Sequence, residues 1–285
     1  MTHKKSAKEQ VLSRRPSFPI MTKPMIELES AIYAARAAGQ LLRENYMRPH
    51  QVDYKGIINI VTEVDRESEH LIYTLLHRDF PDYGFLGEED IRSHSQKETI
   101  WIVDPVDGTS NYARGYPLFA VSIALERNSE VVLGVVYSPV LDELFTAEKG
   151  QGAQLNGKPL QVSTTAELGK SLVASGFPYD TWSTSANNLA EWSRFLLRTI
   201  SARCDGCASL DFCHVACGRV DGYWEIGLDA WDMAAGALIV QEAGGVVTLI
   251  SGAPFTPYQR SVLASNGHLH QAMMAVLNQP GQVEG

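Results

Sequence analysis

The sequence lacks an apolar run that approaches the roughly 20 residues needed to span a membrane. It also lacks an excess of basic residues, because 24 Lys and Arg stand against 33 Asp and Glu, a formal net charge of −9. Affinity for nucleic acid comes from Lys and Arg side chains that neutralise phosphates, so we do not expect this chain to bind along DNA or RNA. A length of 285 residues, 45% of them hydrophobic, instead indicates a globular protein with a sizeable core, which we expect in the cytoplasm.

Cysteine is scarce and confined to one region, since Cys204, Cys207, Cys213 and Cys217 are the only four. The first two form a C-x-x-C pair, which favours metal or redox chemistry, but a zinc ribbon usually has a second such pair after a longer spacer. Cys213 and Cys217 are four positions apart in a stretch with helical periodicity, which places them on one helix face. We interpret these cysteines, and His214 between them, as packing residues. A metal or redox function of the cysteines remains the alternative.

Two boundaries divide the chain. Residues 1–24 are polar and basic and are not followed by the apolar segment of an export signal, so we predict a disordered N-terminal extension. The composition changes again near Ala166–Lys170. We therefore predict an N-terminal α+β subdomain over residues 25–168 and a C-terminal α/β subdomain over residues 169–285.

Hydrophobic periodicity predicts helices that alternate with runs of strands. Apolar residues recur every three or four positions over residues 25–48 and 63–80, and each predicted helix stops before a proline. Between residues 118 and 163 the pattern changes to alternating, β-branched segments separated by turns, which predicts consecutive antiparallel strands. Further helices are predicted over residues 187–200, 210–217, 229–243 and 269–277. This order favours a layered α/β sandwich over a doubly wound sheet.

Acidic residues recur where a predicted strand ends or a predicted helix begins. They are Asp65, Glu88–Glu89, Asp104, Asp107 and Asp232. Taken singly, each has a simpler interpretation: Asp65 and Asp232 would complement a helix N-terminus, and Glu88–Glu89 would form a solvated turn. Asp104 would simply end a strand before Pro105. Their recurrence at four places in the chain is harder to explain in this way.

Considered together, these acids indicate a site for a hard cation and a phosphate. Oxygen ligands in this number suit Mg²⁺, which binds carboxylates along with water and phosphate oxygens. The acidic segments contain no His or Cys, which argues against zinc or copper. Gly108 permits a close backbone approach, and a helix that begins at Thr109 would direct its free amides at a phosphate. The combination predicts metal-assisted phosphoryl hydrolysis.

Three motifs resemble, in their order and spacing, those of the inositol monophosphatase family of lithium-sensitive, magnesium-dependent phosphatases. They are FLGEE at residues 85–89, WIVDPVDGTSNYARGYP at 101–117 and WDMAAGALIVQEAGG at 231–245. The resemblance covers about residues 25–277. It implies the layered αβαβα sandwich of the sugar phosphatases, a homodimer, and hydrolysis of a phosphate monoester, most directly myo-inositol monophosphate, by a metal-activated water.

The resemblance also implies how two to three Mg²⁺ ions would be held. Glu88, Asp104 and the carbonyl oxygen of Val106 would bind a first ion. Asp104, Asp107 and Asp232 would bind a second ion, so that Asp104 bridges the two, and a weaker third ion would lie near Glu88. Most of these ligands fall in the N-terminal subdomain, and Asp232 completes the site from the C-terminal one. Inhibition by lithium is expected, because three carboxylates suit a small cation once phosphate has left.

The catalytic and substrate-binding residues are implied in the same way. Thr109 paired with Asp65 would activate the attacking water, together with Glu88 at the first ion. Substrate contacts are implied for Asp107, Gly108, Thr109, Ala208 and Glu225. The usual G-[ST]-A-A segment of the family reads Gly206-Cys207-Ala208-Ser209 here. This departure lies at the expected rim of the substrate site and leaves the exact substrate open.

Alternative functions remain from the same superfamily and from another class. Related enzymes hydrolyse other sugar phosphates, fructose 1,6-bisphosphate or 3′-phosphoadenosine phosphates. Some bacterial relatives are implicated in transcription complexes, and the basic segment from Lys4 to Arg15 is the feature that would contact such a partner. An interaction or regulatory protein is therefore the alternative of a different class.

Overall fold

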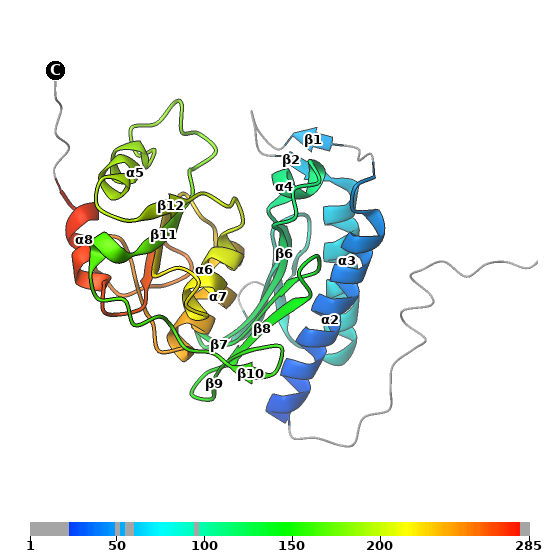
Figure 1. The fold of residues 1–285 in the computed structure, drawn as a ribbon. Coiled ribbons are helices and arrows are strands. Elements are labelled where there is room, and N and C mark those ends of the chain that lie inside the picture. Colours follow the sequence, from blue (N-terminus) through cyan, green and yellow to red (C-terminus); the bar gives the residue numbers. More distant parts are fainter. Residues whose placement is uncertain (1–22, 49–51, 55–59, 94–96, 280–285) are drawn as a thin grey trace, which may run out of the picture.

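Five layers of secondary structure make up the protein (Figure 1). The structure is a computed structural model that describes residues 23–48, 52–54, 60–93 and 97–279. Helices α2 and α3 form one outer layer, followed by an eight-stranded sheet, helices α6 and α7, a five-stranded sheet and an outer layer of α5 and α8. The αβαβα sandwich implied by the sequence resemblance is confirmed.

Apart from α4, the helices overlap the stretches predicted from hydrophobic periodicity. They are α2 (Lys23–Asn45), α3 (Glu63–Asp79), α4 (Thr109–Ala113), α5 (Leu189–Leu196), α6 (Ala208–Ala216), α7 (Ala230–Glu242) and α8 (His270–Leu277). Across the described ranges, none of them combines the length and the apolar character that crossing a membrane requires. Of the predicted extension over residues 1–24, residues 1–22 lie outside the described residues, and α2 already begins at Lys23.

The first sheet has the strand order β10-β9-β8-β7-β6-β5-β3-β4. Its strands are β3 (Gly84–Gly87), β4 (Arg92–Ser93), β5 (Thr99–Asp107), β6 (Ala120–Arg127), β7 (Glu130–Ser138), β8 (Glu143–Glu148), β9 (Gly152–Leu155) and β10 (Lys158–Pro159). The pairings from β5 to β10 are antiparallel, as predicted, and only β3 with β5 is parallel among the described strands of this sheet. A separate pair, β1 (Val52–Tyr54) and β2 (Ile60–Thr62), precedes α3.

The second sheet has the order β12-β11-β13-β15-β14. Its strands are β11 (Leu172–Ser175), β12 (Ser201–Arg203), β13 (Gly222–Ile226), β14 (Val246–Thr248) and β15 (Ser261–Ser265). β11 is parallel to β12 and β13, whereas β15 is antiparallel to β13 and β14. The chain crosses from one sheet to the other between Pro159 and Leu172. The division into subdomains at residues 168 and 169 stays a prediction.

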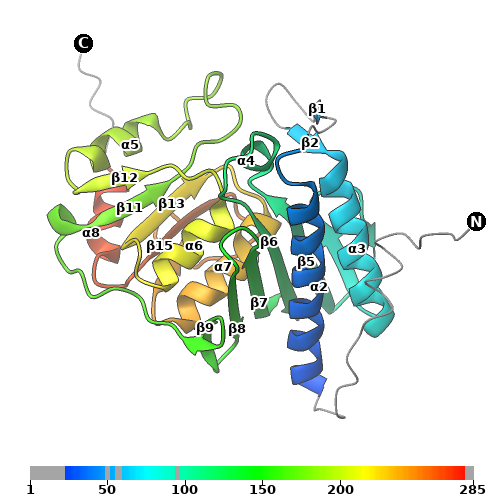
Figure 2. The same cartoon turned by 45° about the vertical axis from the view of Figure 1, so that its right-hand side comes forward.

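Helices α6 and α7 fill the space between the two sheets (Figure 2). α7 is apolar on nearly all sides, which is typical of a helix buried in a core. Glycines let it pack closely: a Cβ at Gly134 would lie 2.8 Å from the Ala235 carbonyl oxygen, and one at Gly236 would meet Phe212. On α6, Cys213 is fully buried, and all four cysteines are free.

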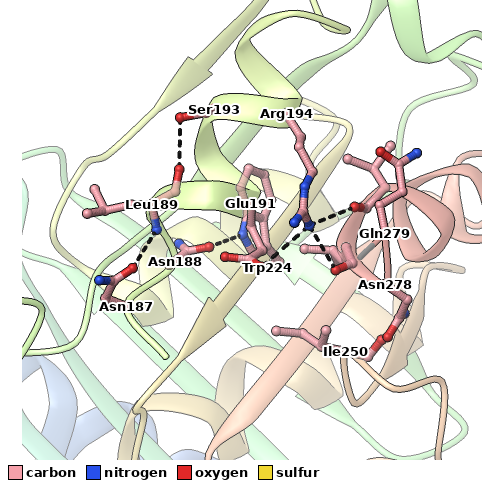
Figure 3. Close-up of polar contacts among 12 residues, drawn as sticks. Asn187, Asn188, Leu189, Glu191, Ser193, Arg194, Trp224, Ile250, Asn278 and Gln279 are labelled. Atoms are coloured by element: carbon pink, nitrogen blue, oxygen red, sulfur yellow. Dashed lines mark hydrogen bonds and ion pairs between the residues drawn. The ribbon is translucent and has the colours of Figure 1, made fainter. Parts of the chain in front are cut away.

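Helix α5 is shorter than the predicted stretch 187–200 and is held by polar contacts (Figure 3). Asn188 has a left-handed backbone, with φ of 68°, so the helix begins only at Leu189. Its side-chain oxygen accepts a hydrogen bond of 2.7 Å from the indole of Trp224 on β13. The guanidinium of Arg194 donates to the carbonyl oxygens of Val276 and Leu277, each at 3.3 Å, at the end of α8.

A buried carboxylate on α3 holds the loop between β3 and β4. Glu69 is only 1% exposed and accepts three backbone hydrogen bonds of 2.8 Å, from the amides of Glu89, Asp90 and Ile91. A Cβ at Gly87 would collide with the same carboxylate. The loop that carries Glu88 is therefore tied to α3, a connection that the sequence alone did not reveal.

We expect Glu69→Gln to loosen this loop, because one carboxylate oxygen becomes an amide donor that faces other donors. Hydrogen bonds to a charged group contribute about 1.5–3 kcal/mol, so exchange of the amides of residues 89–91 should become about 10- to 100-fold faster. Hydrogen–deuterium exchange measures this. The matched control is Glu67→Gln, an exposed position of the same helix. Unchanged exchange in Glu69→Gln would show that the carboxylate does not hold the loop.

Candidate active site

Strand β5 carries two aspartates to the same side of the sheet through an irregularity in its pairing. Side chains three positions apart in a regular strand point to opposite faces. The β5–β6 register shifts between Asp104 and Asp107, where Pro105 has no N–H to offer the ladder. Asp104 Oδ1 accepts a hydrogen bond of 2.9 Å from the Val106 amide. The simpler interpretation of Asp104, that it ends the strand before Pro105, is wrong, because the strand continues through this bulge to Asp107.

Asp232 joins the two aspartates from the first turn of α7. Its Oδ2 accepts a hydrogen bond of 2.7 Å from the amide of Asp229, which precedes the helix. The simpler interpretation of Asp232, an acid at a helix N-terminus, therefore holds as well. One ligand oxygen from each of Asp104, Asp107 and Asp232 lies within 4.8 Å of the others. We call these three residues the aspartate cluster.

Burial and mutual repulsion disfavour ionisation of the aspartate cluster. Burial raises the pKa of Asp104 well above its usual range, and the charges of Glu88, Asp107 and Asp232 raise it further. Burial also raises the pKa of Asp232, again with contributions from Asp107 and Glu88. Buried carboxylates are stable as anions when they are paired or coordinate a metal. The donor set is oxygen alone, so the residues present fit a hard divalent cation such as Mg²⁺.

A threonine and an aspartate beside the cluster form a hydrogen-bonded pair. The Thr109 hydroxyl donates to Asp65 Oδ1 at 2.8 Å and also lies 3.0 Å from the Val106 carbonyl oxygen. Asp65 Oδ2 accepts hydrogen bonds from the amide of Thr62, at 3.0 Å, and from the Thr62 hydroxyl. These hydrogen bonds cap the N-terminus of α3. The carboxylate of Asp65 is thus fixed on both oxygens, with its partner Thr109 also buried.

Thr109 begins a short helix, as the sequence predicted, because Gly108 allows the chain to turn sharply. Gly108 has φ of 91° and precedes the first residue of α4. A Cβ at this position would lie 3.0 Å from the Leu118 carbonyl oxygen and 3.2 Å from that of Gly206. Both the backbone angle and the close approach of neighbouring backbone therefore require glycine.

The N-terminus of α6 is directed at Asp107. Asp107 Oδ2 accepts hydrogen bonds from the Ser209 amide at 2.6 Å, the Ser209 hydroxyl at 2.5 Å and the Cys207 thiol at 3.2 Å. The Ala208 amide lies 3.3 Å from Oδ1. Burial raises the pKa of Asp107, and these hydrogen bonds oppose the rise. Cys207 and Ser209, the two departures from the family pattern, therefore contact Asp107, a role that the sequence did not reveal.

Glu225 lies on β13 under a loop that begins at Gly176. Burial raises the pKa of Glu225 to about 7, while a hydrogen bond of 2.6 Å from the Tyr223 hydroxyl opposes the rise. A Cβ at Gly176 would collide with the Glu225 carboxylate. Tyr179 belongs to the same loop and was not predicted from the sequence as a site residue. Partial burial raises the pKa of its phenol, and the charges of Glu88 and the aspartate cluster raise it further. The loop thus lies near Glu225 on one side and near Glu88 and the aspartate cluster on the other.

The predicted site residues therefore come together from both halves of the chain. Glu88 is close enough to the aspartate cluster to raise the pKa of Asp104, and the charge of Asp107 raises that of Glu225. Thr109 and Asp65 contact each other directly. Glu69 and Tyr179 are residues that only the structure shows at this site, whereas for Ser209 it is the contact with Asp107 that the structure adds.

The chain is similar to a known protein family and to individual members of it. The model of the inositol monophosphatase family matches residues 25–282. Inositol monophosphatase 2 of Solanum lycopersicum is 42% identical over 260 residues, which cover 88% of this chain and 98% of that protein. The Nus factor SuhB of Escherichia coli is 38% identical over 255 residues, 88% of this chain and 95% of that protein.

A solved structure supports the same relation. The inositol monophosphatase from Anabaena superposes with a TM-score of 0.84 and 40% sequence identity, over 92% of this chain and 99% of that one. Its layered fold therefore corresponds to the one described above. The family match over nearly the whole chain, together with these identities, shows that this chain belongs to the inositol monophosphatase family.

Proposed function

We propose that this protein hydrolyses a phosphate monoester with the help of Mg²⁺, and that the substrate is myo-inositol monophosphate. The observation that carries the proposal is the aspartate cluster, three acids with ligand oxygens within 4.8 Å, next to the buried Thr109–Asp65 pair. The names of relatives such as inositol monophosphatase 2 support the choice of substrate. Other sugar phosphates, fructose 1,6-bisphosphate and 3′-phosphoadenosine phosphates are the alternatives within the superfamily.

The residues that would hold the ions follow from the family resemblance and the geometry. Glu88, Asp104 and the Val106 carbonyl oxygen would hold a first Mg²⁺. Asp104, Asp107 and Asp232 would hold a second, and a third, weaker site would lie near Glu88. Bound ions lower the pKa of water and stabilise the negative charge that develops on the leaving oxygen. Lithium sensitivity would follow from the second of these sites.

The chain's own residues would position the water and the substrate. The Thr109 hydroxyl donates a hydrogen bond to Asp65 Oδ1, so its oxygen lone pairs can accept a hydrogen bond from the attacking water. The water's proton would pass to Thr109 as the Thr109 proton passes to Asp65. The amides of Gly108 and Thr109, at the start of α4, would bind the phosphate oxygens. Glu225, Asp107 and the backbone at Ala208 would contact the inositol hydroxyls, on the side of the site beneath the Gly176 loop.

Homodimerisation and a cytoplasmic location remain further proposals. Helix α5 and the segments beside it expose apolar side chains, among them Trp182 at 69%, Leu197 at 85% and Ile200 at 69%. Large exposed apolar side chains are frequent over residues 179–200, and this concentration is the feature that supports a protein–protein contact and hence a dimer. The cytoplasmic location rests on composition and stays a prediction.

A second candidate function is favoured by the similarity to the E. coli Nus factor SuhB. A regulatory role in a transcription complex would need a partner surface rather than the aspartate cluster. The basic segment from Lys4 to Arg15, which we expected to contact such a partner, lies outside the described residues. A cellular phenotype that Asp104→Asn leaves intact would favour this second function.

We expect Asp104→Asn to abolish phosphatase activity, because the bridging carboxylate would be lost while the shape of the side chain is kept. The expected fall in kcat is at least about 10³-fold, in line with the loss of a central electrostatic contribution to the transition state. Phosphate release from inositol 1-phosphate with Mg²⁺ measures it, with fructose 1,6-bisphosphate and a 3′-phosphoadenosine phosphate alongside.

The matched control for Asp104→Asn is Glu130→Gln, a change at an exposed acid paired with Lys149. This variant should keep full activity. Wild-type turnover by Asp104→Asn would overturn the proposed mechanism, and faster turnover of the adenosine phosphate by the wild type would overturn the choice of substrate.

The KM for inositol 1-phosphate should depend on pH through Glu225. Since burial raises the pKa of this carboxyl to about 7, it is protonated below that pH and becomes a full acceptor for a substrate hydroxyl above it. We therefore expect KM to fall several-fold as the pH rises from about 6 to about 8. Glu225→Gln should show only the part of the pH dependence that comes from the substrate phosphate. Identical pH profiles of KM would exclude Glu225 as a substrate ligand.

A further inference from the structure

A second group of metal-ligating side chains lies on α6, apart from the aspartate cluster. Asp211 and His214 are three positions apart on the helix and so share one face. Asp205 approaches the same face from the loop that precedes α6, with Oδ2 at 4.0 Å from His214 Nδ1. One ligand atom from each of the three residues lies within 4.8 Å of the others.

Asp211 is the member of this group that needs a partner. Its side chain is only 1% exposed, and its Oδ1 has no hydrogen-bond partner in the described part of the chain. Burial raises the pKa of Asp211 well above its usual range, and the charges of Asp205 and Glu225 add to the effect. A buried carboxylate without a partner must either bind a proton or be compensated by a cation.

We propose that Asp205, Asp211 and His214 form a second metal site, for a borderline divalent cation of the zinc class. One imidazole nitrogen with two carboxylates is a donor set that suits zinc better than magnesium, unlike the all-oxygen aspartate cluster. Two negative charges and a neutral imidazole balance a divalent ion. Asp205 is partly exposed, so water can reach an ion bound there.

The state and spacing of the ligands fit such an ion. Burial lowers the pKa of His214, which keeps the ring neutral and able to donate a nitrogen lone pair at neutral pH. Ligands at about 2.0–2.2 Å from a tetrahedral zinc lie about 3.4 Å apart, so ligand atoms that are now within 4.8 Å of one another would have to approach by at most about 1.4 Å.

The proposed site lies one helical turn beyond the contact between α6 and the aspartate cluster. Asp107 binds the amides of Ala208 and Ser209 at the start of α6, and Asp211 follows in the same helix. The charge of Asp107 also contributes to the raised pKa of Asp211. Zinc at this position would therefore stabilise α6 where it supports Asp107, and would raise the melting temperature of the whole protein.

Zinc binding to the full-length chain tests the proposal, with Asp104→Asn as background to weaken binding at the aspartate cluster. We expect the Asp104→Asn protein to bind one equivalent of Zn²⁺. The double variant Asp104→Asn/His214→Gln should bind Zn²⁺ at least about 100-fold more weakly, a larger loss than the removal of a residue that only orients a ligand would cause. Titration calorimetry and metal content after dialysis are the measurements. His70→Gln, at an exposed position of α3, is the matched control and should leave binding unchanged.

A second variant guards against misfolding. Asp205→Asn changes a partly exposed loop residue, and it should also lose the zinc-dependent rise in melting temperature while keeping the metal-free melting temperature of the background protein. Equal zinc affinity in the background protein, His214→Gln and Asp205→Asn would overturn the proposal. So would the absence of zinc binding by the background protein, which would mean that Asp211 is neutralised by a proton instead.

Discussion

Repulsion among buried carboxylates is the constraint on which the rest of this structure depends. Asp104 and Asp107, which are buried, and Asp232, which is half-buried, bring ligand oxygens within 4.8 Å of one another, where burial already disfavours their charge. Such a group lowers the stability of the fold unless protons or cations compensate it. The surrounding elements hold the acids in place in spite of that cost. The need for positive charge at this position supports the proposed metal-dependent phosphatase function.

Helix N-termini supply part of that positive charge. The first amides of α6 donate to Asp107, and Asp232 lies in the first turn of α7, so the favourable ends of two helix dipoles meet the cluster. Asp65 occupies the same position in α3 and orients Thr109. Capping and site chemistry are therefore not competing explanations for these acids. A cap fixes one carboxylate oxygen, and the other is left to face Thr109 or the cluster.

The acids of the site could be predicted from the sequence, because each follows a predicted strand or begins a predicted helix. In addition, the three motifs have the same order and spacing as those of the family. Their geometry could not, since the bulge at Pro105 depends on pairing with β6, which is distant in sequence. Glu69 has no mark in the sequence that separates it from an exposed helical acid. His214 was interpreted as a packing residue because helical spacing does not show that Asp205 returns to the same face.

The central claim, that the aspartate cluster holds a pair of divalent ions, is tested most directly by anomalous diffraction. Mn²⁺ accepts the same oxygen ligands as Mg²⁺ and scatters anomalously, so crystals grown with Mn²⁺ and phosphate would reveal its positions. We expect two peaks roughly 3.5–4 Å apart, bridged by Asp104 and in contact with Asp107 and Asp232. Crystals that contain Mn²⁺ but show no peak at these carboxylates would contradict the claim.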